Sequence, residues 1–367
     1  MKIYVFSPSL VTLGIVSNFE SLTHTRQFAG SGKFKLKAPY SPELFALLAE
    51  ENVLYWEDGG RPRAVYIDSV VCDRDKSGET ITASGKNLRA YLGRRIVWTN
   101  LNFSGTVEDF GRRVVSENAV APSDSSRAIP LLSLGARAGL APTITTATEN
   151  ENLEELLDDV SAASEVGFDV TLDREARRLY FTAYEGVDRR TTQSATPWVV
   201  VSRDRNNVVS EVYTRSGASS RNTALISGYT DETTGVRYEK HIVAGSGLSR
   251  REIYVKGSTS KPKADEDAGE TEAQALARYA EELLQKGREK LAKQVATLSL
   301  EVELDPNAVA RLDVGDKVTA IEKQYNLMAQ TYVSEITAYY ERGGTSYDVT
   351  LGDAIPTIYK KIREELV

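Results

Sequence analysis

The sequence predicts an α+β protein that is predominantly β, and three observations lead to this class. Through residues 1–100, short runs rich in Val, Ile, Tyr, Phe and Thr recur about every ten residues, as in antiparallel β-structure. Residues 297–352 alternate apolar and polar side chains like a β-meander. The amphipathic stretch 272–295 predicts a long helix. We expect two small antiparallel β-barrel-like domains with an α+β unit between them and this helix inserted in the second barrel.

The length of 367 residues exceeds what one hydrophobic core usually supports, so about two to four domains are expected. We place an N-terminal barrel at 1–100 and an α+β domain at 101–197. The second barrel is expected at 198–352, discontinuous and interrupted by a linker and helix at 260–296. Residues 353–367 are expected to form a C-terminal helical tail.

The first hundred residues show about six strand-like runs, interrupted at Pro42–Ala49 by one or two expected helical turns. Core positions are expected at Tyr66, Ile67, Val70 and Val71. The single cysteine, Cys72, excludes an internal disulfide, and we expect it to be a buried small apolar residue in a strand.

From Gly85 the spacing of apolar residues becomes helical. The segment GKNLRAYLGRRIV is expected to form a helix with Leu88, Tyr91 and Leu92 on one face, ending at Gly93. A second helix is expected after an N-cap at Thr106. Its buried face is expected to consist of Val107, Phe110, Val114 and Val115.

The middle of the α+β unit contains a connector, a helix and a hairpin. Residues 121–150 are rich in Pro, Ser, Thr and Ala, and we expect little regular structure there. The helix that follows is expected to stop at Gly167. Its buried residues are expected to be Leu153, Leu156, Leu157 and Val160. FDVTLDREARRLYFTAYEG then predicts two strands joined at Asp173–Ala176.

The last third of the chain is strand-rich on both sides of a helix. Strands are expected within 198–257, an exposed charged linker at 260–272, and a helix whose stripe runs from Leu276 to Val295. Gly315 and Asp316 predict a tight turn. We expect the strands of 198–257 and 297–352 to close one barrel around the helix.

Few residues of the sequence are suited to catalysis. The two histidines, His24 and His241, fall in different predicted domains, and neither has a neighbouring motif that would activate a nucleophile. Acidic clusters at 149–155 and 265–267 and the pair Asp158 and Asp159 fall at helix starts or in the linker, where dipole and solvation explain them. We expect no catalytic, cofactor-binding or metal-binding residues, and therefore no enzyme.

Charge limits the partners that the protein can hold. A net charge of −7 argues against a protein that grips nucleic acid by its phosphates. No apolar run approaches the roughly 20 residues needed to cross a bilayer, so no membrane insertion is expected. Five arginines of the second strand block form either a basic patch or ion pairs with a neighbouring subunit: Arg205, Arg215, Arg221, Arg250 and Arg251.

The order of these segments resembles the tail-hub proteins of bacteriophages, both the siphophage hub (tail-associated) proteins and the hub of contractile-tail baseplates. The likeness lies in four stretches and spans nearly the whole chain. They are GKNLRAYLGRRIV, FSGTVEDFGRRVVSENAV, the helix and hairpin of ENLEELLDDV and GFDVTLDREARRLYFTAYEG, and the closing LDVGDKVTA and YVSEITAYYERGGTSYDVTLGDA.

The resemblance implies a homotrimer whose two barrels per subunit form a pseudo-sixfold ring. Such a baseplate hub joins the tail tube and distal-tail protein to the fibre or receptor-binding protein, next to the tape-measure protein. It implies a virion tail tip of a phage or prophage, assembled in the bacterial host cytoplasm. Many siphophage hubs continue into a peptidase or fibre domain, whereas this chain ends at IPTIYKKIREELV, so no lytic activity is carried over.

Two hypotheses compete with a structural role, and a third follows from it. One rival is a cell-wall-degrading tail enzyme that uses a carboxylate pair. The other is a carbohydrate-binding module with an aromatic platform made of Trp56, Trp98 or Trp198. If the chain forms a ring, the negative net charge suggests an acidic lumen through which DNA passes without specific binding.

Overall fold

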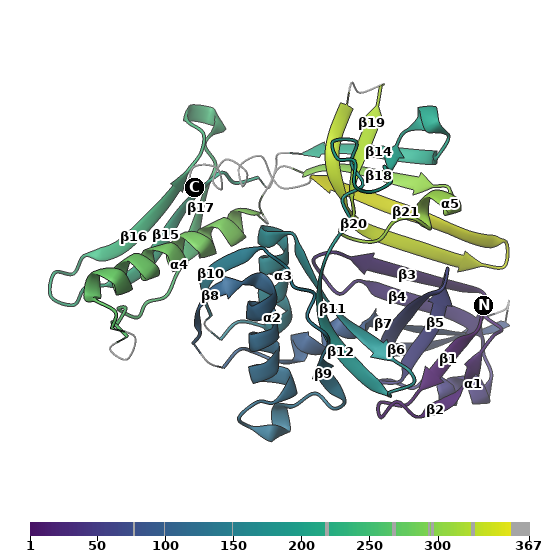
Figure 1. Ribbon diagram of the computed structural model, residues 1–367. Helices are drawn as coiled ribbons and strands as arrows, with labels where there is room; N and C mark the ends of the chain where they lie inside the picture. Colours follow the sequence, from purple (N-terminus) through teal and green to yellow (C-terminus); the bar gives the residue numbers. More distant parts are fainter. Residues whose placement is uncertain are drawn as a thin grey trace.

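The computed structural model describes residues 1–75, 78–98, 100–148, 150–216, 220–265, 269–292, 294, 297–323 and 327–353. Figure 1 shows the N-terminal strands beneath the closing strands, the helical unit beside them, and an outlying sheet that carries α4 (Glu272–Ala292). The content is predominantly β with helices, as the sequence predicts. No helix among the described residues is long and apolar enough to span a membrane.

One large sheet contains most strands of both terminal blocks. Within the described residues its thirteen strands follow the order β14-β18-β21-β20-β3-β4-β7-β6-β5-β1-β2, with β19 beside β20 and β13 beside β19. The strands are β1 (Ile3–Phe6), β2 (Thr12–Val16), β3 (Ser21–Gln27), β4 (Lys33–Pro39), β5 (Val53–Asp58), β6 (Arg61–Asp75), β7 (Gly78–Asn87), β13 (Val200–Val201), β14 (Val208–Ser216), β18 (Thr297–Leu304), β19 (Lys317–Glu322), β20 (Leu327–Glu341) and β21 (Gly344–Asp353).

Antiparallel pairing of β3 with β20 joins the two blocks into this single sheet. Thr25 lies opposite Thr337, and their hydroxyls are 3.0 Å apart. The pairing order among the described strands is open, with β2 and β14 at its ends, so the two separate closed barrels expected from the sequence are not seen. The reason is that β3 satisfies its backbone groups with a strand more than 300 residues away, a long-range pairing that local patterns do not encode.

The N-terminal strands bury one apolar core. Leu22, Leu36, Leu54 and Trp56 are buried there, and α1 (Pro42–Leu47) forms between β4 and β5 where helical turns are expected. Ser41 caps α1 by accepting a hydrogen bond from the Leu44 N–H at 3.1 Å.

Two core predictions for β6 are wrong. Tyr66 and Ile67 are buried and Val70 is half-buried, but Val71 is 57% exposed and Cys72 is also exposed. Pairing of β6 with β7 shifts register after Ile67, and residues 71–74 of β6 with 78–79 of β7 form an exposed end of this hairpin, the β6–β7 arm. Apolar residues in a strand are buried only when another layer covers them, and β6 is covered no further than Val70, which packs against the N-terminal core.

The helical unit confirms most of the predicted elements. The elements are a 3₁₀ helix (Leu88–Arg94), β8 (Asn102–Thr106), α2 (Val107–Val115), a π-helical turn (Ser116–Val120), a 3₁₀ turn (Ser125–Arg127), β9 (Leu132–Leu134), β10 (Thr143–Ala147), α3 (Leu153–Ser164), β11 (Val166–Asp173) and β12 (Arg178–Glu185). Thr106 caps α2 through the Asp109 N–H at 3.1 Å. The predicted apolar faces of α2 and α3 are buried.

Three details of this unit differ from prediction. The segment after Gly85 forms a 3₁₀ helix, because the chain turns from β7 into extended backbone at Arg95 within a short distance. Residues 121–150 contain β9, which pairs with β12, and β10, which pairs with β8. Helix α3 ends at Ser164, with Glu165 as its left-handed C-cap residue, and Gly167 already belongs to β11.

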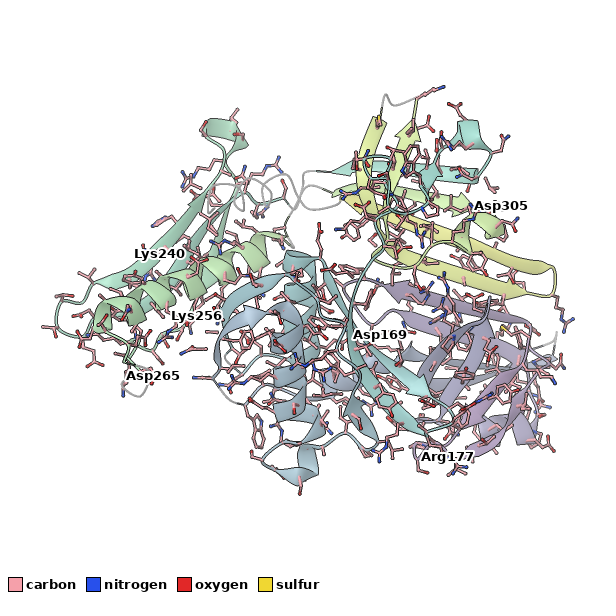
Figure 2. All side chains as sticks on the ribbon, in the orientation of Figure 1. Asp169, Arg177, Lys240, Lys256, Asp265 and Asp305 are labelled. Carbon is pink, nitrogen blue, oxygen red and sulfur yellow. The ribbon has the colours of Figure 1, made fainter. Side chains whose placement is uncertain are left out.

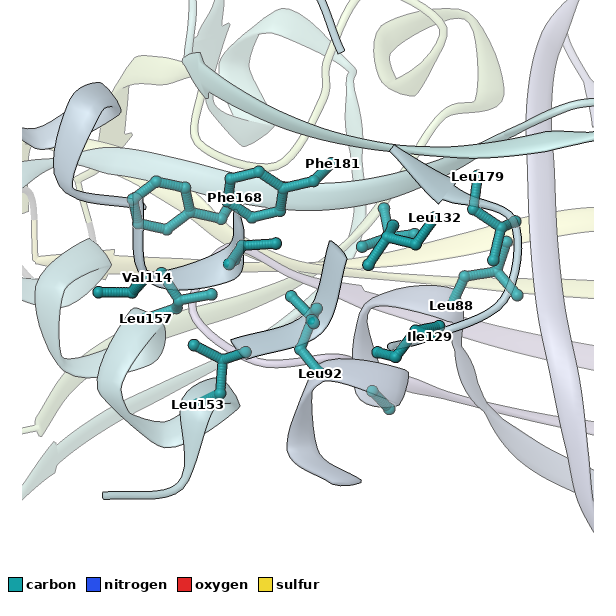
Figure 3. Packing of buried hydrophobic residues seen from close by; sticks show 14 of the residues in the cluster. Leu88, Leu92, Val114, Ile129, Leu132, Leu153, Leu157, Phe168, Leu179 and Phe181 are labelled. Atoms are coloured by element: carbon teal, nitrogen blue, oxygen red, sulfur yellow. The ribbon is translucent and has the colours of Figure 1, made fainter. Parts of the chain in front are cut away.

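Figure 3 shows part of the apolar core of the helical unit. Phe168 and Phe181 of the hairpin stack with ring centroids 5.6 Å apart, and Val114 and Leu157 of the two helices lie beside them. Tyr55 and Tyr66 of the N-terminal strands belong to the same cluster. The helical unit is therefore bound to the N-terminal strands by a continuous apolar core.

A separate small sheet with α4 projects from the molecule (Figure 1). Its strands, in the order β16-β15-β17, are β15 (Thr223–Thr230), β16 (Arg237–Val243) and β17 (Glu252–Lys256). We call β15, β16, β17 and α4 the outlying module. Tyr279, Leu283 and Leu291 of α4 pack on Ile226 and Ile242. The prediction that all strands of 198–257 join the closing block is wrong for these three, because the apolar stripe of α4 covers one face of their sheet.

The closing strands have their own core and a short helix, α5 (Pro306–Val309). The apolar face predicted for β18 contributes Leu300, Val302 and Leu304 to that core. Gly315 adopts a φ of +89° in the predicted turn. Val295 and the expected helical tail beyond residue 353 lie outside the described residues.

Candidate functional site

A cavity of about 490 Å³ lies where the three main parts of the chain meet. We call it the junction cavity. Its walls come from β3 and β6 of the N-terminal strands, from the hairpin β11–β12, and from residues 313–316 before β19. In Figure 2, Asp169 of β11 lies in the middle of the molecule, whereas Lys240, Lys256 and Asp265 lie on or beside the outlying module. The cavity thus marks the contact between segments far apart in sequence.

Two arginines of the N-terminal strands hold the loop before β19. Arg26 of β3 and Arg61 of β6 both form ion pairs with Asp313, the second at 3.2 Å. Arg61 also donates to the carbonyl oxygens of Leu312 at 2.7 Å and Ala310 at 3.2 Å. Burial alone would raise the pKa of Asp313, but the guanidiniums of Arg26 and Arg63 outweigh it and hold that pKa below its ordinary value.

Asp316 ties the hairpin to the same loop. Its buried carboxylate accepts hydrogen bonds from the Val187 N–H at 2.8 Å, from Arg189 Nε at 3.1 Å and from the Asp313 N–H at 3.1 Å. Lys317 next to it pairs with Glu165 at the end of α3, at 2.6 Å. Asp316 therefore belongs to the turn that the sequence predicts. It also joins that turn to the segment after β12, a contact that the sequence does not predict.

Arg63 and Asp169 also line the junction cavity, and neither takes part in the ion pairs described above. Among the described residues, Arg63 donates no hydrogen bond, and its one ion pair, with Asp58, spans 3.9 Å. Burial lowers the pKa of Arg63 to about 10. Burial likewise raises the pKa of Asp169, although the Val170 N–H donates to its carboxylate at 2.8 Å.

His24 also lines the cavity and has a structural environment. Its Nε2 lies 2.7 Å from the side-chain oxygen of Asn87, and its ring meets Trp56 edge-on at 4.9 Å between centroids. Burial lowers the pKa of His24 to about 3, so the imidazole is neutral at physiological pH. His241 lies on β16 in the outlying module with an exposed side chain, so the structure does not bring the two histidines together.

Three of the acidic residues singled out in the sequence make ion pairs. Glu151 pairs with Lys286 at 3.6 Å and Asp159 with Lys290 at 3.2 Å, which links the helical unit to α4. Asp158 pairs with Arg89. Glu149, Glu266 and Asp267 lie outside the described residues. Within the described part of the chain, no cluster of three or more His, Cys, Asp or Glu side chains has a geometry suited to a metal.

The three tryptophans do not form one platform. Trp56 is fully buried in the N-terminal core, whereas Trp98 and Trp198 are about half exposed, at 51% and 55%. The Arg127 guanidinium covers the ring of Trp98, 3.8 Å from its centroid. An aromatic surface for carbohydrate that includes Trp56 is therefore excluded.

Three of the five arginines considered as a basic patch donate hydrogen bonds to nearby residues of the same part of the chain. Arg250 donates to Glu252 at 2.6 Å, and Arg251 donates to Ser220 at 2.9 Å. Arg221 donates to the carbonyl of its neighbour Ser220 at 2.8 Å. The side chain of Arg215 lies outside the described residues, and Arg205 is exposed at the end of a 3₁₀ turn.

Sequence reasoning singled out His24 and Asp316 of the junction cavity for other reasons and missed its remaining charged residues. The available signal was a charged residue within an otherwise regular strand, such as Arg26, Arg63 or Asp169. That pattern is common on solvated strand faces, and only the meeting of three segments turns these positions inward. The cavity is a product of the tertiary fold.

Comparison with solved structures places this architecture in a known class. The fold is similar to a 43 kDa tail protein of prophage MuSo2 from Shewanella oneidensis, with a TM-score of 0.59, 15% identity, and 96% of this chain and 98% of that chain covered. A tail protein from Neisseria meningitidis MC58 matches with a TM-score of 0.56, 14% identity and 96% coverage of both chains. Prophage tail protein gp18 from Listeria monocytogenes EGD-e matches with a TM-score of 0.55, 12% identity, and coverage of 99% and 98%. At these identities the similarity establishes a shared fold.

A sequence match over nearly the whole chain identifies its family. Residues 2–353 match the siphovirus ReqiPepy6 Gp37-like proteins, and the chain belongs to that family. No curated protein sequence matches it. The resemblance to phage tail proteins is thereby confirmed, and the chain is a phage-tail-related structural protein.

Proposed function

We propose that the chain is a baseplate hub at the tip of a phage or prophage tail. Its copies form a ring that joins the tail tube and distal-tail protein to the fibre or receptor-binding apparatus. The observation that carries this proposal is the whole-chain correspondence: the siphovirus family spans residues 2–353, and the fold follows three prophage tail proteins over at least 96% of the chain.

In this proposal the protein is a structural component and not an enzyme. The charged groups around the junction cavity support this, because Asp313 and Asp316 hold strands and loops together. His24 is neutral and bonded to Asn87, so it is poorly suited to act as a general base near neutral pH. A cell-wall enzyme would need two carboxylates converging on a substrate groove.

The proposed ring is a homotrimer, and β2 offers a surface for contact between copies. It lies at one end of the strand order, so one edge of its backbone has no strand beside it among the described residues. Val11, Leu13 and Ile15 are 46%, 47% and 48% exposed along this edge. An unpaired edge with exposed apolar side chains favours pairing with another chain.

Images of assembled tail particles test the proposal. We expect density for three copies in a ring at the tail tip, beside the distal-tail and tape-measure proteins. A particle in which this chain occurs once, or lies away from the tip, would contradict it. In a complementation assay, the double variant Leu13→Lys, Ile15→Lys is expected to block tip assembly, whereas Val71→Lys on the exposed β6–β7 arm serves as the matched control.

The route of DNA through the ring is a second part of the proposal. We propose that acidic residues line the lumen, so that DNA passes without adhering, consistent with the net charge of −7. A structure of the assembled ring decides this directly, because a basic lumen would refute it. The ring would be assembled in the bacterial host cytoplasm and act at the virion tail tip.

A further inference from the structure

The guanidinium of Arg63 is a buried charge without an adequate counter-ion. Its side chain is only 11% exposed, and its Nε has no hydrogen-bond acceptor among the described residues. Asp58 lies 3.9 Å away, beyond hydrogen-bond distance, and its carboxylate accepts a hydrogen bond from the Tyr347 hydroxyl at 2.9 Å. A buried cation in this state is costly unless a further partner satisfies it.

Positive charge gathers on this wall of the junction cavity. Arg26, Arg61 and Arg63 line it together with Asp313, to which both Arg26 and Arg61 are paired. Asp313 is thus already engaged by two guanidiniums, and the ion pair of the third, Arg63, is with Asp58 at 3.9 Å. Guanidinium groups are planar donors whose geometry matches carboxylate and phosphate oxygens.

The opposite wall of the cavity contains the carboxyl groups of Asp169 and Glu185, while Asp316 is already paired with Arg189. Asp169 lines it, and no ion pair of Asp169 is found among the described residues. Burial favours the neutral form of its carboxyl and raises its pKa.

We propose that the junction cavity binds a small oxyanion of the carboxylate or phosphate class, with Arg63 as its principal donor. The volume of about 490 Å³ falls within the range of roughly 300–1,000 Å³ found for small-molecule sites. Because the walls come from three segments of the chain, a bound anion stabilises their mutual arrangement by mass action. This inference does not depend on the role in the tail.

Calorimetric titration at constant ionic strength tests the site. Sodium phosphate and sodium citrate are titrated separately into the purified chain, with chloride making up the ionic strength. We expect one ion per chain. Arg63→Gln is expected to weaken binding about tenfold or more. Arg74→Gln is the matched control, because that side chain is 83% exposed on the β6–β7 arm, and it is expected to leave the affinity unchanged.

The outcomes separate the sources of the anion and decide the proposal. Binding of phosphate alone assigns a phosphate group, and binding of citrate alone assigns carboxylates. No binding of either ion, or equal weakening by Arg63→Gln and Arg74→Gln, overturns the proposal. If Arg63→Gln does not fold, crystals of the unaltered chain soaked in selenate decide instead: an anomalous peak beside Arg63 supports the site, and a peak only on the outer surface refutes it.

Discussion

Two glycines set the distance between the hairpin and the closing strands. A Cβ added at Gly186 would lie 1.9 Å from the carbonyl oxygen of Gly315. Gly315 itself has a φ of +89°, which L side chains rarely adopt, and a Cβ there would meet the ring of Phe28 at 2.8 Å. The tight turn predicted at 315–316 therefore has a second role, which is to let Gly186 approach its backbone.

Substitution of Gly186 by alanine is expected to destabilise the protein by about 3 kcal/mol or more, because backbone atoms cannot yield to the new methyl group. The free energy of unfolding in urea measures this. Gly343→Ala is the matched control, since its Cβ would meet nothing within 4 Å, and it is expected to change stability by less than about 0.5 kcal/mol. Equal stability of the two variants would contradict the close approach.

Glu108 is a buried carboxylate of α2 that organises a loop. It accepts hydrogen bonds from the backbone N–H groups of Ala138 at 2.7 Å, Gly139 at 2.8 Å and Leu140 at 3.1 Å. Burial works to raise its pKa, but the three donors outweigh burial and hold the pKa below its ordinary value. The loop between β9 and β10 therefore depends on a charged acceptor.

Glu108→Gln is expected to lower the free energy of unfolding by about 1–3 kcal/mol at pH 7. A depressed pKa stabilises the fold above the ordinary glutamate value, about 4.3, and this contribution disappears as the pH falls through the lower folded pKa. The difference in unfolding free energy between Glu108→Gln and the unaltered protein should therefore become smaller in acid. Chemical unfolding at several pH values measures it, with Glu175→Gln, an exposed residue of the turn between β11 and β12, as control. A difference in unfolding free energy that does not change with pH would refute the role of the charged Glu108 carboxylate.

At the scale of elements, α4 determines whether the outlying module is formed. Its Gly287 lets the helix lie close to the sheet, because a Cβ there would be 2.8 Å from both Ile226 Cδ1 and Ile242 Cδ1. Leu283 of the same helix is buried against β15 and its neighbours. The core of this module is small and separate from the others, so its stability depends on few side chains.

Leu283→Ala is expected to cost about 2–4 kcal/mol, confined to this module. Hydrogen–deuterium exchange should then accelerate in β15, β16, β17 and α4 while β20 and β21 keep their protection. Leu248→Ala is the control, because Leu248 is fully exposed in the loop between β16 and β17. Faster exchange throughout the chain would show that the module is not an independent unit.

At the scale of the whole molecule, the outlying module is held to the helical unit by charge. Lys286 and Lys290 of α4 pair with Glu151 and Asp159. Between these lysines lies Glu289, which is buried and accepts a hydrogen bond from Gln285 at 3.1 Å. Burial raises the pKa of Glu289 to about 7, and the charge of Glu151 adds to this.

This contact predicts a pH dependence. Between the ordinary glutamate pKa of about 4.3 and the folded value, the folded protein binds a proton that the unfolded chain has lost, so stability falls as the pH rises. Glu289→Gln should remove this fall in stability. At pH 8 its free energy of unfolding should exceed that of the unaltered protein by up to about 3 kcal/mol. The exposed Glu272→Gln is the control. Identical pH profiles for Glu289→Gln and the unaltered chain would exclude the prediction.

Local patterns in the sequence predicted much of the fold. The faces of α2 and α3, the N-cap Thr106, the hairpin of β11 and β12 and the meander around β18–β21 follow from periodicity and capping. The prediction failed for Cys72 and Val71, whose strand has the right composition but no layer above it. It also failed for β9 and β10, short strands that form because partners are available.

By itself, the sequence determined the class of the protein, its main helices and strands, and its likeness to phage tail proteins, since these rest on residue order and on spacings of 2 and about 3.6 residues. Only the tertiary structure decided that β3 and β20 form one sheet, that α4 covers a separate one, and that Arg63 and Asp169 share a cavity. The physical reason is sequence distance. Backbone pairing and charge burial are settled between residues tens to hundreds of positions apart, and no local pattern records which of many partners a strand or charge will meet.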